Sequence, residues 1–182
     1  MHNIILILFF LWLLGGCATI PAEQCATIDW YDLGVKDGLA GYVAANRLVR
    51  HRDACAGVKI VPNEKLYLQG HQEGLAKYCR PENALREGLA GRSYANVCDQ
   101  TFKYIHQAAY GVYYLKHRID NNLDEVSRKE AELRDEKTSS SQRNKLRSEI
   151  RDLDRQRETL RDDLFSAERE LERILKAPAP VR

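Results

Sequence analysis

The chain has 182 residues, with 28 Lys or Arg against 26 Asp or Glu. This near balance gives no argument for nucleic acid as a partner, because nucleic-acid-binding domains present an excess of basic side chains to the phosphates. The length suits one modest core with an extended element and is short of what two full domains need. We therefore expect one compact domain with an appended helical arm.

The first expected element is a lipoprotein signal peptide over residues 1–16. An uncharged apolar run from Ile4 ends in Leu14-Gly15-Gly16-Cys17. The run has about eleven residues, which matches a signal peptide and falls short of the roughly 20 that span a bilayer. We expect Cys17 to be lipidated with diacylglycerol and palmitate. The alternatives are an ordinary secretory signal, with Cys17 as a structural thiol, and an uncleaved membrane anchor.

Lipidation of Cys17 predicts where the mature protein lies. More than one acyl chain on a single cysteine gives stable membrane anchoring without a spanning helix. The residue after the cysteine is Ala18 rather than an Asp. By analogy with lipoproteins of Gram-negative bacteria, we therefore expect sorting to the outer membrane. The protein would then face the periplasm of the cell envelope.

Four further cysteines follow, namely Cys25, Cys55, Cys79 and Cys98. An even number in an oxidising compartment favours two disulfides over a metal site. The cysteines form no CxxC, and no pair has the close spacing of zinc ribbons or fingers. We expect no metal and no other cofactor. Three connectivities are open at this point.

A glycine-rich helix is repeated along the first half of the chain. Residues 31–42 and 67–78 match position for position, and residues 84–91 form a third, shorter copy. Asp29 and Asn63 stand where helix N-caps are expected. The small residues recur at helical spacing on one face; the glycines are Gly34, Gly38, Gly41, Gly70, Gly74, Gly88 and Gly91.

Close helix packing is the simplest role for these glycines. Each glycine inside a helix costs about 1 kcal/mol relative to alanine, so something must need the missing side chain. Small residues on one face let two helix backbones approach each other. The alternatives are a glycine groove that faces a ligand and a phosphate-binding loop, although no β-alternating run precedes any copy.

Three stretches carry a resemblance to a family. They are Asp29-Trp30-Tyr31-Asp32-Leu33-Gly34, then Leu66-Tyr67 with Gly70, Gly74 and Cys79, and last Gly88, Gly91 and Ser93 with Cys98. Together they resemble the YfiL-like bacterial lipoproteins, domain-of-unknown-function family 2799, over residues 17–111. The resemblance implies an envelope lipoprotein and brings no catalytic residues. It also implies a disulfide between Cys79 and Cys98, which leaves Cys25 to pair with Cys55.

A helical hairpin is expected over residues 105–176. Apolar residues alternate at spacings of three and four from Ile105 to Leu133 and again from Leu146 to Ile174, which predicts two coiled-coil seams. Residues 137–142 between them are polar and rich in capping types, which favours a turn. The expected fold class is therefore all-α, with a disulfide-braced glycine-repeat domain over 17–104, the hairpin, and a Pro/Ala tail over 177–182.

The register of the hairpin follows from its polar positions. Folding back at the turn sets Asn122 opposite Arg157 and leaves Lys129 as a mismatch against an apolar residue. It also places Glu136 opposite Arg143. The stretch resembles no part of the short family members, so no role for it follows from the resemblance. The alternative is one continuous helix that needs a partner chain along its length.

No motif identifies a reaction. His51, His71, His106 and His117 form no HExxH pattern, and the chain has no nucleophile elbow. The densest basic group of the small domain is a candidate site for phosphate or carboxylate groups, with a solvated helix end as the alternative; it comprises Arg47, Arg50, His51 and Arg52.

Two functions from different classes follow. The favoured one is a membrane-anchored envelope lipoprotein that acts as a structural or partner-binding module, with the hairpin contacting an envelope protein. The alternative is a binder or enzyme that acts on envelope glycans or lipids. We favour a role without catalysis, because a hairpin whose two helices cover each other's apolar seam is better suited to binding a partner than to catalysing a reaction.

Overall fold

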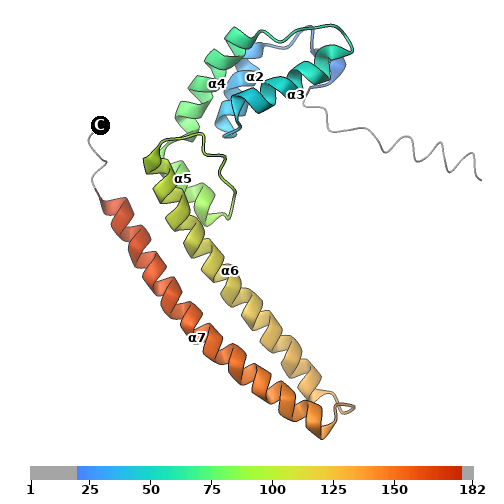
Figure 1. Cartoon of the computed structure of the whole chain (residues 1–182), viewed down its shortest axis with the longest axis vertical. Helices are drawn as coiled ribbons and strands as arrows, with labels where there is room; N and C mark the ends of the chain where they lie inside the picture. Colours follow the sequence, from blue (N-terminus) through green and yellow to red (C-terminus); the bar gives the residue numbers. More distant parts are fainter. Residues whose placement is uncertain (1–19, 178–182) are drawn as a thin grey trace, which may run out of the picture. The chain divides into compact units, whose positions relative to one another are not determined.

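The computed structural model describes residues 20–177, so the expected signal peptide, Cys17 and most of the tail lie outside the described part. As predicted, the described residues form an all-α structure (Figure 1), and it contains two disulfides. None of the helices within residues 20–177 combines the length and apolarity needed to span a membrane. The elements are η2 (Ala22–Gln24), α2 (Trp30–Leu39), α3 (Ala44–Ala56), α4 (Glu64–Tyr78), α5 (Pro81–Leu89), α6 (Gln100–Arg134) and α7 (Ser140–Lys176).

The chain divides into two compact units between Tyr78 and Cys79. The sequence pattern had instead predicted a first domain that ends at residue 104. The difference arises because the third glycine copy, in α5, packs on the start of α6. The helix that carries this copy therefore belongs with the hairpin, and the two units are described separately below.

The first unit is built on the close packing of α2 against α4. A Cβ atom on Gly34 would lie 2.1 Å from the carbonyl oxygen of Tyr67, and one on Gly70 would lie 2.0 Å from that of Tyr31. No side chain fits at such distances, so the two backbones are in direct contact. The four glycines that line this contact are Gly34, Gly38, Gly70 and Gly74.

The helices of this pair begin at the expected caps. The Oδ1 atom of Asp29 accepts hydrogen bonds from the backbone N–H groups of Tyr31 at 2.8 Å and Asp32 at 3.1 Å. Asn63 Oδ1 accepts from the N–H of Leu66 at 3.1 Å in the same way. Each cap satisfies donors of the first helical turn that have no partner inside the helix.

Gly41 and Gly91 differ from the expectation that they lie on the packing face. Gly41 has φ of 69° and Gly91 has φ of 68°, a left-handed conformation that glycine adopts without strain. Each follows the end of its helix, and the next N–H bonds back to a helical carbonyl, from Tyr42 to Asp37 at 3.1 Å in the first case. This is a Schellman motif, so these two glycines terminate helices α2 and α5.

The core of the first unit joins both helices to α3 and to the start of the described chain. Cys25 and Cys55 form the predicted disulfide, with 5.7 Å between their Cα atoms. The buried cluster consists of Ile20, Cys25, Trp30, Leu48, Cys55 and Tyr67. The disulfide therefore fixes the segment before α2 to the C-terminal end of α3.

The second unit repeats the helix pair with α5 and α6. A Cβ on Gly88 would lie 2.6 Å from the carbonyl oxygen of His106, as one on Gly38 would lie 2.2 Å from that of His71. His106 Nε2 lies 3.0 Å from the carbonyl oxygen of Arg92. Its counterpart His71 Nε2 lies 2.8 Å from that of Tyr42. The start of α6 is therefore a fourth copy, which the sequence analysis did not recognise.

Helices α6 and α7 form the predicted antiparallel hairpin (Figure 1). The turn occupies residues 135–139, slightly before the expected 137–142, because Ser139 and Gln142 form a capping box that starts α7. Leu146, Leu160 and Leu171 are buried in the seam. Arg143 does not pair with Glu136 as expected; it donates to the carbonyl oxygens of residues 135 and 138 at 3.0 and 2.9 Å.

Candidate functional site

A buried carboxylate, that of Asp37, gathers three polar side chains inside the first unit. Arg47 donates to it from Nε at 3.1 Å and from Nη2 at 3.0 Å. His51 Nε2 lies 2.7 Å from Asp37 Oδ2. Tyr67 donates its hydroxyl to the same oxygen at 2.9 Å. The cluster thus joins α2, α3 and α4 around one acid.

The glycine contact brings these groups together. Because α2 and α4 touch at the backbone, Tyr67 on α4 lies close enough to reach Asp37 on α2. Helix α3 contributes Arg47 and His51, which are four positions apart and so lie on one helix face. The ring of Tyr67 meets that of His51 edge-on at 5.5 Å between centroids, an arrangement that aromatic quadrupoles favour.

The electrostatics of the cluster favour an ionised Asp37. Burial alone would raise the pKa of Asp37, but hydrogen bonds from His51, Arg47 and Tyr67 lower it from 3.8 to about 2. Burial and the hydrogen bond to Asp37 raise the pKa of Tyr67. The hydrogen bond to Asp37 raises the pKa of Arg47. At neutral pH the cluster is therefore a fixed ion pair with two further hydrogen bonds.

The burial of this cluster assigns it a structural role. Asp37 is 4% exposed, and His51 and Tyr67 are fully buried. A substrate has no direct approach to the carboxylate, since its oxygens already accept four contacts from protein groups. Of the four side chains only that of Arg47 reaches the surface, where it lies 4.4 Å from the ring centroid of Tyr42.

The structure disperses the four basic residues that the sequence analysis grouped as an anion site. Arg47 and His51 are directed at Asp37, and Arg52 pairs with Glu64. Arg50 is exposed. Three of the four thus already meet a carboxylate of the chain, which leaves Arg50 as the position where anion binding stays a prediction.

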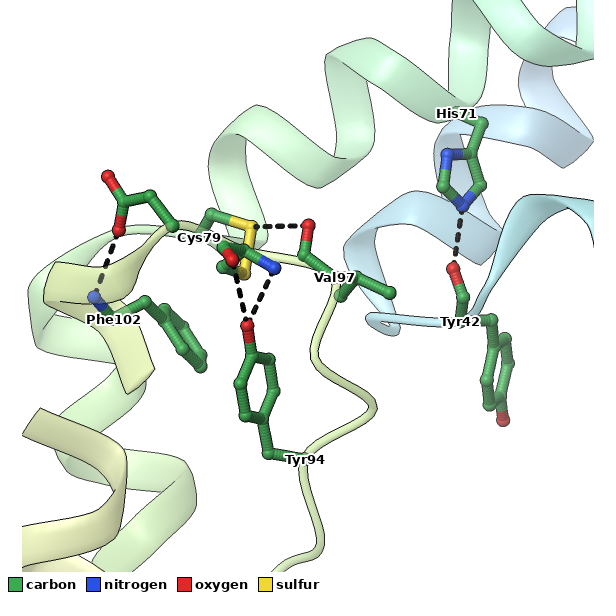
Figure 2. Close-up of a disulfide and its surroundings, with 8 residues drawn as sticks. Tyr42, His71, Cys79, Tyr94, Val97 and Phe102 are labelled. Carbon is green, nitrogen blue, oxygen red and sulfur yellow. Dashed lines mark hydrogen bonds between the residues drawn. A yellow bond between two sulfur atoms is a disulfide. The ribbon is translucent and has the colours of Figure 1, made fainter. Parts of the chain in front are cut away.

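The second disulfide has its own polar support in the second unit. Cys79 and Cys98 are bonded as predicted. Figure 2 shows the hydroxyl of Tyr94 between the backbone groups of Cys98, accepting from its N–H at 2.7 Å and donating to its carbonyl oxygen at 3.1 Å. The Tyr94 ring lies 4.9 Å from that of Phe102. This tyrosine therefore ties the extended segment before α6 to the helix.

A polar layer crosses the hairpin where the two seams predict it. Arg157 Nη1 donates to Asn122 Oδ1 at 3.1 Å, and Asn122 Nδ2 donates to the carbonyl oxygen of Leu153 at 3.0 Å. The mismatched Lys129 pairs with Glu149 at 2.9 Å. These contacts fix the register, because a slip of one residue would leave a partly buried amide and two cations without these partners.

Exposed aromatic residues lie on the outer faces of the hairpin beside arginines. Phe165 is 60% exposed, and the guanidinium of Arg169 lies 5.5 Å from its ring centroid. Tyr114 is 50% exposed, with Arg118 at 5.9 Å. Aromatic and arginine side chains are the types that most often dominate the energy of protein interfaces. They make these faces candidates for contact with a partner.

The histidines show no arrangement for metal binding. Within residues 20–177, no group of three or more His, Cys, Asp or Glu side chains is placed to hold a metal ion. His51, His71 and His106 are buried against protein acceptors, and His117 stacks on the ring of Tyr113 at 5.9 Å.

Asp37 and Tyr67 are members of the buried cluster that the sequence did not reveal. A signal was available in the repeat, where the residue directly before a helical glycine is acidic in each copy, as Asp37, Glu73 and Glu87. Nothing in the sequence separates the buried Asp37 from the exposed Glu73 and the half-buried Glu87, because all three precede a glycine on a helix. The distinguishing groups come from α3, which occurs in one copy alone.

Comparison with known proteins gives two matches. Residues 29–112 match the family model described as protein of unknown function (DUF2799). The chain is also 30% identical over 90 residues to the uncharacterized protein YfiL of Escherichia coli (strain K12), a match that covers 48% of this chain and 69% of YfiL. No solved structure matches. The matched residues contain both copies of the helix pair, and α7 lies beyond them.

Proposed function

The chain belongs to the DUF2799 family of proteins of unknown function, and we propose that it is an envelope lipoprotein, anchored through Cys17, whose hairpin contacts a protein partner. The anchor is supported by the apolar run that ends in Leu14-Gly15-Gly16-Cys17. With Ala18 after the cysteine, the proposed location is the periplasmic face of the outer membrane.

The observation that carries the partner-binding role is the sealed hairpin. The two helices of the hairpin cover its apolar seam, and the hydrogen-bonded pair of Asn122 and Arg157 occupies the middle of that seam. A helix of 35 residues extends about 50 Å, which gives the unit a long surface and little internal volume. The exposed Phe165 and Tyr114, each beside an arginine, provide apolar contact points on that surface.

Crosslinking in intact envelopes tests the contact. A photoreactive phenylalanine analogue at position 165 or 114 should form an adduct with one and the same envelope protein. The matched control carries the analogue at Lys145, whose side chain is 78% exposed near the turn, and should form none. Phe165→Ala should also weaken the adduct formed from position 114. Equal adducts at all three positions, or none at 165 and 114, would contradict the role.

The anchor is tested separately with Cys17→Ser. We expect this variant to keep its leader and to leave the outer-membrane fraction, with an intact mass that lacks the lipid. A Cys17→Ser protein that is still processed and still fractionates with the outer membrane would refute lipidation at this residue.

A further inference from the structure

The connection between Cys17 and the folded protein is very short. Ile20 is only 2% exposed and belongs to the core of the first unit, together with Cys25 and Trp30. Only two residues, Ala18 and Thr19, lie between Cys17 and Ile20 in the sequence. We infer that the first unit lies directly on the lipid surface and inserts the apolar turn of residues 57–61, an inference that rests on the proposed lipidation of Cys17.

The reach of the chain limits how far the unit can stand from the membrane. The three Cα–Cα steps from Cys17 to Ile20 span at most about 11 Å even when fully extended. The acyl chains of a lipidated Cys17 must lie within the bilayer, and side chains at an interface penetrate about 5–10 Å. Because Ile20 is fixed in the core, the surface around it has no room for a layer of water or protein between itself and the lipid headgroups.

The disulfide identifies which surface this is. Cys25 is bonded to Cys55, with 5.7 Å between the Cα atoms, so the start of the described chain lies beside the end of α3. The turn that follows α3 closes back on the carbonyl oxygen of Cys55, which accepts from the N–H groups of Val58 at 3.2 Å and Ile60 at 3.3 Å. The turn is therefore held next to the anchored end of the unit.

The composition of the turn fits an interface with lipid. Val61 is 76% exposed and Val58 is 44% exposed, although both are apolar. Lys59 lies between them and is exposed. Ile60 packs against the core and gives the turn a fixed base. Apolar side chains with an adjacent lysine are typical of segments that enter the headgroup region, where the ammonium group stays in contact with the polar layer.

Quenching by brominated lipids tests the insertion in the lipidated full-length protein. The protein is reconstituted into phosphatidylethanolamine and phosphatidylglycerol vesicles, with or without bromine on the acyl chains, and carries either Val61→Trp or Leu39→Trp. Leu39 is the matched control, since it is 46% exposed and lies nine residues along α2 from Trp30, or about 14 Å. Trp30 is buried and provides a constant background in the parent protein.

We expect brominated lipid to reduce the additional emission of the Val61→Trp variant by about twofold, as for a side chain at interfacial depth, and to leave that of Leu39→Trp unchanged. Inserting about 20 Gly and Ser residues between Ala18 and Thr19 adds roughly 25 Å of root-mean-square reach, and should remove the quenching. Equal quenching at positions 61 and 39, no quenching at 61, or full quenching with the long linker would each overturn the inference.

The intact mass of the reconstituted protein separates this failure from failure of the proposed anchor. A mass that includes the lipid, combined with an unquenched Val61→Trp, refutes the insertion of the turn and leaves the anchor standing. A mass without lipid refutes the anchor, and with it the membrane contact that depends on the short connection.

Discussion

Replacing Asp37 by Asn should remove the contribution that the Asp37 carboxylate makes to the pH dependence of the first unit's stability. The pKa of Asp37 is about 2, against an ordinary value of 3.8. Each pH unit of difference corresponds to about 1.4 kcal/mol, so the ionised form contributes about 2 kcal/mol at neutral pH. Because Asp37 is 4% exposed, solvent screening does not reduce this value strongly.

The sign follows from the lowered pKa. The contribution is fully present above the pKa of Asp37 in the unfolded chain, near pH 4, and is lost as the pH falls toward 2. We therefore expect the free energy of unfolding of Asp37→Asn to fall below that of the parent by about 2 kcal/mol more at pH 7 than near pH 2. Near pH 2 Asp37 is about half protonated in the folded parent and almost fully protonated in the unfolded parent, so little of the contribution remains.

Guanidinium unfolding followed by tryptophan fluorescence measures this difference. Trp30 is the one tryptophan in a chain that begins at residue 17, and its ring lies 6.5 Å from that of His51 in the cluster. Glu87→Gln is the control, because Arg92 also lowers the pKa of Glu87 but is itself largely exposed. The Glu87→Gln substitution should shift the unfolding transition reported by Trp30 less than Asp37→Asn does. A difference between Asp37→Asn and the parent that is the same at both pH values would refute the reasoning.

Three further predictions concern the packing, the hairpin and the disulfide. Gly38→Ala would place a Cβ 2.2 Å from a backbone oxygen of α4, and should destabilise the first unit by about 2–3 kcal/mol in denaturant unfolding, whereas Gly57→Ala, with open space around it, should have little effect. Arg157→Leu should leave a monomer in sedimentation with a stability within about 1 kcal/mol of the parent, and cysteines at positions 126 and 153 should crosslink within one chain; bonds between chains alone would contradict the hairpin. Replacing Cys79 and Cys98 by Ser should cost about 3 kcal/mol in the chain-entropy account of a 19-residue separation, and an unchanged melting temperature would argue against that contribution.

Local patterns predicted the helices, the caps and the hairpin. The alternation of apolar residues identifies a seam because it repeats within a few residues, and Asn122 and Arg157 mark the register because each is polar at a position of the seam. The pairing of Cys79 with Cys98 came from the family resemblance. Such features depend on neighbours in the sequence or on a shared motif, so they can be found before the fold is known.

The Asp37 cluster could not be found in this way, because its members come from three helices. Asp37, His51 and Tyr67 are each ordinary residues of a helix face, and only the contact of α2 with α4 brings them together. The division after Tyr78 was missed for a related reason. The start of α6 repeats the pattern of α4 with Phe102 in place of Tyr67 and Ala109 in place of Gly74, so the glycine that marks the copy is absent.

Ala109, which stands in α6 where the repeat has a glycine in α4, explains how the hairpin is attached to its helix pair. Ala109 is fully buried, and its Cβ lies where a side chain on Gly88 of α5 would have to go. It also belongs to an apolar cluster with Val112 and Leu171 of the hairpin, and Leu85 of α5 packs against that cluster. One face of α6 thus serves both the family's helix pair and the hairpin seam. Since α6 continues from Gln100 to Arg134 without a break, the disulfide-bonded helix pair of the second unit and the hairpin share one continuous helix.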